Sequence, residues 1–271
     1  MNKTHILGFE IDTYRANDLI DQLVSKCLDK RSETFRVIQI NPEILVAANY
    51  SKHIKKLIDG ANYKVANGVG VQWAAQYSSS KKNSFYQLIK SLLRIITKPE
   101  ANKQIIPDLF NSSSLTKPLL RKLDSHSSKL LIAASPKNSN LNTTLNYLRS
   151  KFEGLEIFGF DSSKFDGDSM VGLTKLAKNR QPDLILLGIG FPLQEEVASK
   201  LKSELSHGVI ITEGGTFDYE AFGGKIKRAP SAVQKIGLEW LWRLIEEPSR
   251  LKRQLSLMEF IKLVHKSSKK H

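Results

Sequence analysis

The sequence is poor in cysteine and has no long apolar run. Its 271 residues include one cysteine, Cys27, so the chain cannot form an internal disulfide or a cysteine-based zinc site. No stretch approaches the roughly 18 apolar residues that a membrane-spanning helix needs. The first residues, MNKTHILGFEID, lack the apolar segment of a signal peptide. We therefore expect a cytoplasmic chain that can rest on a membrane without crossing it.

Acidic residues are also in deficit, and there is no acidic tract. The chain has 41 lysines and arginines against 27 aspartates and glutamates, a net charge of +14. This balance favours an anionic partner: a nucleic acid, an acidic membrane surface or a phosphorylated substrate. No recognised nucleic-acid module or aromatic-basic pattern supports the first, so we expect no nucleic acid. The six histidines are scattered without metal-ligand spacing, and no metal or cofactor is expected.

Short apolar runs alternate with longer amphipathic ones along most of the chain. Unbroken runs of this kind are typical of parallel strands covered on both faces. The alternation predicts an α/β fold: a Rossmann-like, mostly parallel sheet with helices on both faces and ligands at the carboxyl ends of the strands. We expect strands at 35–40, 129–134, 155–160, 183–190 and 208–212, and helices at 16–30, 43–58, 69–77, 141–152, 169–180, 194–206 and 231–246.

Two regions interrupt the alternation. Residues 78–128 contain a basic amphipathic segment, 85–96, followed by three prolines, and we expect a lid-like excursion from a domain that spans 1–247. The remaining residues, 248–271, are expected to form a basic helical appendage with apolar residues along one face. Such a helix either lies on an anionic bilayer or packs on its own domain with a solvated basic face.

Three glycine turns are candidate sites, one after a short apolar run and two after predicted strands, and each has an ordinary interpretation beside a functional one. Gly68-Val69-Gly70 lacks the third glycine and the acidic residue of a nicotinamide site. In LLGIGFPLQEE, Gln194 can contact a ligand at a helix N-terminus that favours phosphate, or the segment simply starts a helix. In TEGGTFDYEAFGG, glycines allow close approach of backbone to a ligand.

Arginines and one aspartate pair complete the candidate groups. Guanidinium groups are well suited to binding a diphosphate, although any single arginine could equally belong to a solvated basic surface. The candidate arginines are Arg228, Arg243, Arg250 and Arg253. Asp166-Gly167-Asp168 fits an Asp-x-Asp metal motif, but Asp168 also fits the start of a helix, and we expect no metal there.

Taken together, these segments resemble the WecG/TagA/CpsF glycosyltransferases, family 26. The motifs are GIGFPLQE, GGTFDYEAFGGKIKRAP and GLEWLWRLIEEPSRLKR, with INPEILVAAN and ANGVGVQWAA nearer the N-terminus. The resemblance covers most of the chain and is weakest over 78–128. It implies metal-free, inverting transfer of N-acetylmannosamine or a related sugar from a UDP carrier to a polyprenyl-diphosphate-linked acceptor in surface polysaccharide synthesis. It also implies an appendage that meets the inner face of the cell membrane and helps to close the site.

The resemblance also implies roles for individual residues. Asn41 falls in the substrate pocket, Gln194 near the nucleotide sugar, and the tail arginines near the diphosphate. The residues expected to bind substrate are Gln39, Asn41, Gly68, Gly70, Gly190, Pro192, Gln194, Glu195, Gly214, Gly215, Phe217, Asp218, Arg228, Arg243, Arg250 and Arg253, and those expected at the catalytic position are Asn67 and Asp108.

The chain departs from the family pattern at several positions. Asn67 stands where the family has an aspartate read as the general base, and Gln39 stands in place of a threonine. Leu193 replaces a basic residue after Pro192, and Asn102-Lys103 replaces a Glu-Arg pair. An amide can accept a hydrogen bond but cannot hold a proton at neutral pH, so Asn67 can orient an acceptor without acting as a base.

Three outcomes follow from Asn67. Another carboxylate, Asp108 or Glu43, takes the proton; or a slow enzyme relies on electrostatic stabilisation of the departing UDP; or the protein binds a nucleotide sugar or lipid-linked glycan without turnover. We expect the glycosyltransferase, with the non-catalytic binding protein as the alternative, and leave homo-oligomerisation open.

Overall fold

The computed structural model describes residues 3–80, 84–136, 139–227, 229–230, 233, 242, 244–245 and 251–269, and of residues 251–254 it describes the backbone alone. Its centre is an eight-stranded sheet with the order β1-β2-β4-β3-β8-β7-β5-β6. All neighbouring strands run parallel except β1 and β2. The strands are β1 (Lys3–Ile6), β2 (Phe9–Asp12), β3 (Phe35–Ile40), β4 (Tyr63–Ala66), β5 (Lys129–Ala134), β6 (Glu156–Asp161), β7 (Leu184–Gly188) and β8 (Val209–Thr212).

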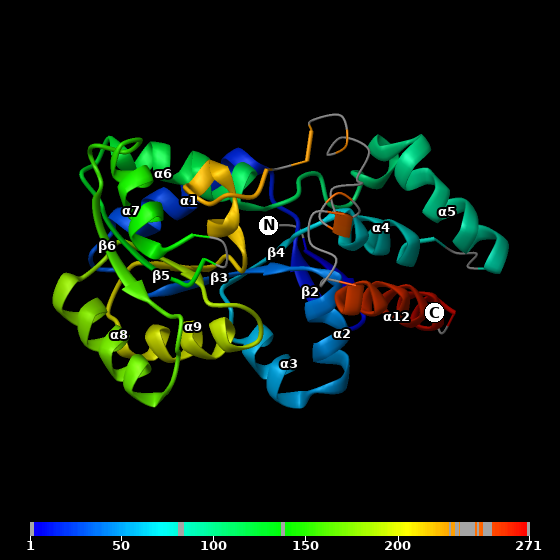
Figure 1. Ribbon diagram of the computed structural model, residues 1–271. Coiled ribbons are helices and arrows are strands. Elements are labelled where there is room, and N and C mark those ends of the chain that lie inside the picture. The colour runs from blue at the N-terminus through cyan, green and yellow to red at the C-terminus, as the bar shows by residue number, and fades with distance from the viewer. Residues whose placement is uncertain are drawn as a thin grey trace.

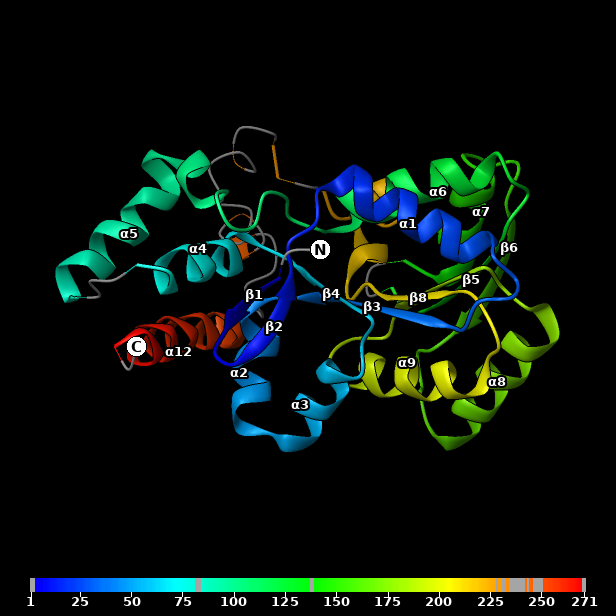
Figure 2. The ribbon, with the colours of Figure 1, turned by 180° about the vertical axis from the view of Figure 1, so that it is seen from behind.

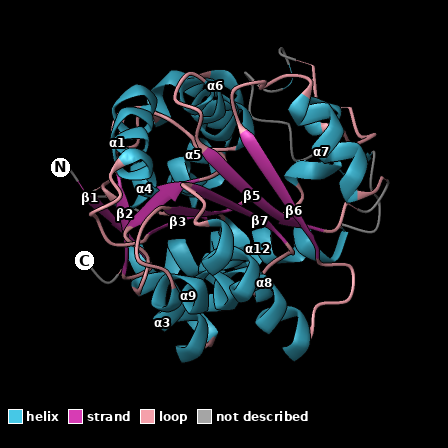
Figure 3. Ribbon diagram, turned by 90° about the vertical axis from the view of Figure 1, so that its left-hand side faces the viewer, coloured by secondary structure: helices cyan, strands magenta, loops and turns pink. Residues whose placement is uncertain are grey.

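Helices cover both faces of this sheet (Figures 1 and 3). The first part of the chain supplies α1 (Ala16–Leu28), α2 (Pro42–Tyr50), α3 (Lys52–Asp59), α4 (Val69–Ser78) and α5 (Phe85–Thr97). The later part supplies α6 (Lys117–Asp124), α7 (Leu141–Arg149), α8 (Gly167–Arg180), α9 (Leu193–Glu204) and α12 (Leu251–Ser268). Short turns of helix are η1 (Pro99–Asn102), η2 (Ser112–Thr116), η3 (Thr216–Asp218) and η4 (Glu220–Phe222). The predicted α/β class is confirmed.

Side chains of successive strand residues point to opposite faces of the sheet, so the core forms a separate layer on each face. In β5, Leu130 and Ile132 pack with α1, α6 and α7, whereas Leu131 and Ala133 point to the opposite face and pack with α8 and α9. Successive strand residues point to opposite faces, so a strand covered on both sides must be apolar throughout. This requirement explains why the run KLLIAA is recognisable in the sequence.

Segments that the sequence pattern missed are short or polar. The hairpin of β1 and β2 turns through Leu7 and Gly8, both with positive φ (53° and 79°), as a tight two-residue hairpin turn requires. The single helix expected over 43–58 is interrupted at Ser51, whose hydroxyl accepts a hydrogen bond from the Ile54 N–H at 3.3 Å and starts α3.

The segment 78–128 differs from a simple excursion. Its first part, α5, stands at the edge of the molecule, but its second part returns to the core. Phe110 and Leu115 are buried, and α6 packs its leucines under α1. Pro118 lies in the first turn of α6, where proline is well tolerated, so this proline begins a helix that the sequence analysis did not anticipate.

The last helix, α12, packs on the domain. It lies against α2 and α4, and Phe260 and Val264 are fully buried. The Phe260 ring meets Trp73 edge-on at 6.3 Å between centroids. Leu255 and Met258, by contrast, are exposed. Most of the expected helix at 231–246 lies outside the described residues. Within the part of the chain that the structure describes, no helix combines the length and apolarity that crossing a bilayer requires.

Candidate active site

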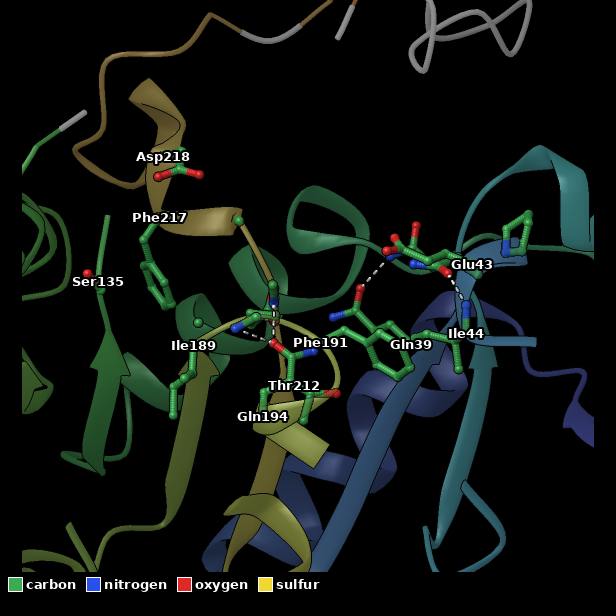
Figure 4. Close-up of a pocket in the computed structure, with 18 of the residues that line it drawn as sticks. Gln39, Glu43, Ile44, Ser135, Ile189, Phe191, Gln194, Thr212, Phe217 and Asp218 are labelled. Atoms are coloured by element: carbon green, nitrogen blue, oxygen red, sulfur yellow. Dashed lines mark hydrogen bonds between the residues drawn. The ribbon is translucent and has the colours of Figure 1, made fainter. Parts of the chain in front are cut away.

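A cavity of about 360 Å³ opens at the carboxyl ends of the central strands (Figure 4). After β3 the chain moves to β4 on one side, while β8 and β7 lie on the other. The crevice therefore sits at the switch point of the sheet, where open α/β folds bind ligands. Its lining residues are Gln39, Asn41, Pro42, Glu43, Ile44, Asn67, Ser135, Pro136, Gly188, Ile189, Gly190, Phe191, Gln194, Thr212, Glu213, Gly214, Gly215, Phe217, Asp218, Ser256 and Leu257.

One wall is formed by the ends of β3 and β4. Asn41 caps α2, because its Oδ1 accepts a hydrogen bond from the Ile44 N–H at 2.9 Å. On the next strand, Asn67 Nδ2 donates to Gln39 Oε1 at 3.0 Å, and the Asn67 N–H donates to the Ile40 carbonyl at 2.7 Å. Both ends of Asn67 are thus tied to β3, which fixes its side chain at the pocket.

The opposite wall is organised by Gln194. Its buried Oε1 accepts from the Gly190 N–H at 3.3 Å and from the Gly214 N–H at 3.0 Å. These glycines follow β7 and β8 and have positive φ values of 104° and 56°, which glycine adopts without steric cost. A single side chain therefore holds two of the three predicted glycine turns together. It donates in turn to Glu195 Oε1 at 3.2 Å.

Glu195 lies beneath this wall and is not among the lining residues. It is buried, and desolvation raises the pKa of its carboxyl group, although Thr212, Arg36 and Gln194 favour the ionised form. Burial lowers the pKa of Arg36, while Glu195 opposes that change. A buried carboxylate facing a buried guanidinium is costly to separate, so this pair supports the turns rather than contacting a ligand.

Glu213 is a lining carboxylate that the sequence analysis did not single out. Both of its carboxylate oxygens accept threonine hydroxyls: Thr116 donates to Oε1, and Thr216 donates to Oε2 at 2.7 Å. Desolvation nevertheless raises the pKa of Glu213, against the effect of Thr116, Thr216 and Gln39. Its position between β8 and Gly214-Gly215 was the available signal, because side chains at strand ends gather at the switch point.

Other lining residues come from segments far apart in the chain. Ser135 and Pro136 follow β5, and Ser256 and Leu257 come from α12, which therefore contributes to the pocket wall. Phe217 packs over β7 so closely that a Cβ on Gly188 would lie 2.5 Å from its ring. Gly188 consequently has no room for a side chain, and its backbone forms part of the floor.

The structure brings most of the predicted site residues together and separates a few. Gln39, Asn41, Asn67, Gly190, Gln194, Gly214, Gly215, Phe217 and Asp218 line the cavity; Gly68, Gly70, Pro192 and Glu195 flank it without lining it. Asp108 is not a lining residue, because its carboxylate accepts from the Ala16 N–H at 2.8 Å and caps α1.

The predicted arginines fall largely beyond the described part of the chain. Arg228, Arg243 and Arg250 lie outside the described residues, and of Arg253 only the backbone in α12 is described. Asp166 caps α8, accepting from the Ser169 N–H at 2.8 Å. Among the described residues, no three histidine, cysteine, aspartate or glutamate side chains are grouped to hold a metal ion.

Comparison with known proteins identifies the family. The model of the glycosyl transferase WecG/TagA/CpsF family matches residues 4–106 and 100–271. The chain belongs to the WecG/TagA/CpsF family of glycosyl transferases. The resemblance noted in the sequence motifs is thereby confirmed, and so is the expected class of hexosyltransferase in cell-envelope polysaccharide synthesis.

Two curated WecG/TagA/CpsF-type relatives are similar over nearly the whole chain. An N-acetylglucosaminyldiphosphoundecaprenol N-acetyl-beta-D-mannosaminyltransferase of Bacillus spizizenii (strain ATCC 23059 / NRRL B-14472 / W23) is 27% identical over 247 residues, covering 91% of this chain and 84% of the relative. The protein of the same name from Bacillus subtilis (strain 168) is 25% identical over 253 residues, covering 92% and 86%. The alignments include both walls of the pocket.

Proposed function

We propose that this protein transfers an N-acetylmannosamine-type sugar from UDP to a polyprenyl-diphosphate-linked N-acetylhexosamine, with inversion at the anomeric carbon. The observation that carries the proposal is the glycine-lined cavity at the switch point, in a chain that aligns over 91–92% of its length with two N-acetylmannosaminyltransferases. A non-catalytic binding protein is the alternative, but a fixed amide at one position does not by itself favour it.

The donor diphosphate has a plausible place beside the glycine turns. Gly188, Gly190, Gly214 and Gly215 bring backbone close to the cavity, so a diphosphate can approach without meeting side chains. The amino end of α2 also opens onto it, and helix N-termini favour anions. In this proposal the tail arginines, including Arg250 and Arg253, reach the diphosphate when residues 248–271 close the site as an appendage.

The transfer requires a proton acceptor. The acceptor hydroxyl oxygen bonds to the anomeric carbon while the bond from that carbon to the diphosphate oxygen breaks, and UDP leaves with the bonding pair. In this proposal the hydroxyl proton passes to a carboxylate, since Asn67 cannot hold it. Of the two carboxylates considered from the sequence, Glu43 lines the cavity and Asp108 does not. Glu43 projects beside Gln39 (Figure 4), and we assign it the role of base.

The acceptor lipid places the reaction at a membrane surface. Ser256 and Leu257 line the pocket, and their neighbours Leu255 and Met258 are exposed on α12. We propose that this part of the tail meets the inner face of the cell membrane, bringing the mouth of the pocket to the lipid diphosphate. Exposed apolar side chains with Lys262 one turn further along the helix suit an anionic bilayer.

A transfer assay tests the proposal. Purified protein is incubated with UDP-N-acetylmannosamine and an N-acetylglucosaminyl-diphosphate on a short, water-soluble isoprenoid, and the products are separated by mass. We expect UDP and the corresponding disaccharide lipid in equal amounts, with Glu43→Gln lowering the rate by about 10²–10⁴. Glu100→Gln, at an exposed position, is the control. Tight donor binding by calorimetry without product at any enzyme concentration would instead support the binding protein.

A further inference from the structure

Helix α5 exposes a row of large apolar side chains. Phe85, Ile89, Leu93 and Ile96 recur at spacings of four, four and three residues, which places them on one helical face. They are exposed by 69, 43, 58 and 49%, and Tyr86 beside them by 69%. Scattered single apolar residues on a surface need no explanation, but a contiguous row of this size marks an interaction site.

These exposed residues are not needed to hold α5 on the domain, because a different apolar face of the same helix packs against the core. Leu88 is buried, and Leu92 and Ile95 are partly buried against the core cluster of α4 and α12. The Trp73 Nε1–H donates to Ser91 Oγ at 2.9 Å and fixes α5 on α4. The helix is therefore apolar over a wide arc, of which the inner half is used by the fold and the outer half faces away.

Basic residues border the outer face. Lys90, Arg94 and Lys98 follow the apolar row around the helix and are exposed, and no aspartate or glutamate occurs within Phe85–Thr97. The Lys90 ammonium lies 6.0 Å from the Tyr86 ring centroid. An apolar stripe edged by lysine and arginine is the pattern of a helix that lies in the headgroup region of an anionic bilayer.

The position of α5 agrees with this orientation. Both ribbon views place α5, α4 and α12 at one end of the molecule, with β6, α7 and α8 at the other (Figures 1 and 2). Helix α12, on which Leu255 and Met258 are exposed, extends towards the same end. A second copy of the chain is a poorer occupant, because self-association through α5 would bring together two helices with cationic and no acidic side chains, in a chain of net charge +14.

We propose that α5 is a membrane-docking helix that inserts Phe85, Ile89, Leu93 and Ile96 into the interface of an anionic phospholipid bilayer. Lys90 and Arg94 contact the lipid phosphates. The fold has anchored the helix on α4 beforehand, so little conformational freedom is lost when it binds. This docking does not depend on which sugar is transferred, and it adds a second contact to that proposed for the tail.

Vesicle sedimentation with the full chain tests the docking. Vesicles of phosphatidylcholine alone are compared with vesicles containing phosphatidylglycerol. Replacing Ile89 and Leu93 together by glutamine, a good helix former, should weaken binding to the anionic vesicles at least about tenfold. Replacing Lys90 and Arg94 by glutamine should weaken it by about fivefold or more and reduce its salt dependence. The matched control is Val171→Gln on α8, where an even more exposed apolar residue (68%) lies on a helix at the far end of the molecule, and it should bind like the wild type.

A second measurement reports insertion directly. In a Leu93→Trp variant, the new indole should shift its fluorescence to shorter wavelength when anionic vesicles are added, relative to the wild-type change. Circular dichroism and thermal melting establish that each variant is folded. Unchanged sedimentation of the Ile89→Gln/Leu93→Gln variant, or no indole shift, would overturn the proposal. So would a dimer in light scattering that this double variant dissociates, since the face would then bind a second copy.

The outcome is separable from that of the proposed reaction. The Ile89→Gln/Leu93→Gln variant should retain transfer to the short-chain, water-soluble acceptor, while transfer to an acceptor embedded in anionic vesicles falls. If the wild type binds vesicles through α5 yet transfers no sugar in either format, the proposed function fails and the docking helix stands. If sugar transfer proceeds but substitutions in α5 leave vesicle binding unchanged, only the docking proposal is contradicted and the proposed function stands.

Discussion

Asn67 is held more firmly than a simple surface amide. Its side chain donates to Gln39 on β3, and its backbone N–H donates to Ile40 on the same strand. The family resemblance implies an aspartate base at this position, and this chain offers instead a fixed amide in a cavity that the carboxylate of Glu43 also lines. Whether the reaction has lost a base or relocated it is therefore a question about two residues of the same cavity.

Replacing Asn67 by aspartate distinguishes these cases. If the site lacks a base, the new carboxylate should raise kcat. We expect an increase of no more than about 10²-fold, which is the smallest effect typical of a general base. The Gln39 side chain can accommodate it, because its amide can turn to present Nε2, a buried nitrogen, to the carboxylate. The measurement is steady-state release of UDP from UDP-N-acetylmannosamine with the short-chain acceptor.

Asn67→Ala and Glu43→Gln complete this set. The alanine variant removes the hydrogen bond to Gln39 without supplying a base, so it should not exceed the wild-type rate. If Asn67→Asp leaves the rate unchanged while Glu43→Gln abolishes it, the proton passes to Glu43. If neither substitution changes the rate, the assignment of the base to this wall of the pocket is wrong.

Glu213, which lines the pocket, makes the stability of the folded chain depend on pH. Burial raises the pKa of its carboxyl group above the ordinary value of 4.5. Above pH 4.5 the unfolded chain has lost this proton while the folded chain still holds it, so this group makes the folded state less stable as pH rises towards the folded pKa. Glutamine does not titrate, and Glu213→Gln should therefore gain stability relative to the wild type as the pH rises above 4.5 towards the folded pKa of Glu213.

Urea unfolding at several pH values measures this difference, and a glutamate near the surface provides a contrast of opposite sign. Lys178 and Lys200 hold the pKa of Glu204, whose side chain is 27% exposed, at about 2. Glu204→Gln should therefore lose stability relative to the wild type as pH rises from 2 to 5, by a small amount because ion pairs near the surface contribute little. A Glu213→Gln variant whose relative stability is constant with pH would show that Glu213 titrates alike in both states.

At the scale of elements, α12 is both a packing helix and a wall of the site. It inserts Phe260 and Val264 between α2 and α4 and presents Ser256 and Leu257 to the cavity. Tyr77 and His265 are joined by a hydrogen bond of 2.7 Å between the Tyr77 hydroxyl and His265 Nδ1. The C-terminal segment is therefore fixed at its distal half, which positions the pocket-lining turn before it.

Phe260→Ala should reveal this anchoring. Truncating a fully buried phenylalanine that meets Trp73 edge-on should lower the free energy of unfolding by about 3–5 kcal/mol. It should also weaken donor binding, since Leu257 lies one turn earlier on the same helix. Leu255→Ala, at an exposed position on α12, should change stability by less than about 0.5 kcal/mol. Equal effects of the two substitutions would contradict the packing of α12.

The elements also show what sequence patterns can and cannot predict. β5 was predictable because a strand buried on both faces is apolar almost throughout, and β3 was predictable from its other residues although it also buries Arg36 and Gln39. β1, with its sequence KTHI, and β4, with only four residues, carry no such signal. Likewise the glycine turns were predictable as parts of one site, and Glu213 was signalled by its place just before Gly214, but Ser135 was not predictable, because only the strand order brings the ends of β5 and β8 to the same crevice.

At the scale of the whole molecule, the net charge and the arrangement of the exposed apolar helices both favour binding to an anionic membrane. The net charge is +14, and the proposed donor, leaving group, acceptor and bilayer are all anionic. Helices α5 and α12 lie on the same side of the molecule, and α12 also supplies Leu257 to the pocket. Protein that reaches the bilayer with this side first has its pocket within reach of a lipid-linked diphosphate.

This arrangement predicts that salt affects membrane-bound and water-soluble acceptors differently. Raising the salt from about 0.1 M to about 1 M shortens the Debye length from about 10 Å to about 3 Å, which weakens attraction between the basic surface and anionic lipid. Transfer to an acceptor embedded in phosphatidylglycerol vesicles should then fall by at least about tenfold, since each lysine or arginine near the surface contributes about 1 kcal/mol. Transfer to the short-chain acceptor should fall less, because salt then weakens only the binding of the diphosphate in the pocket.

The ratio of the two transfer rates, measured at each salt concentration in one titration, isolates the contribution of membrane binding. A ratio that is independent of salt would mean that the positive charge serves the pocket alone and that the apolar contacts bring the protein to the bilayer without electrostatic help.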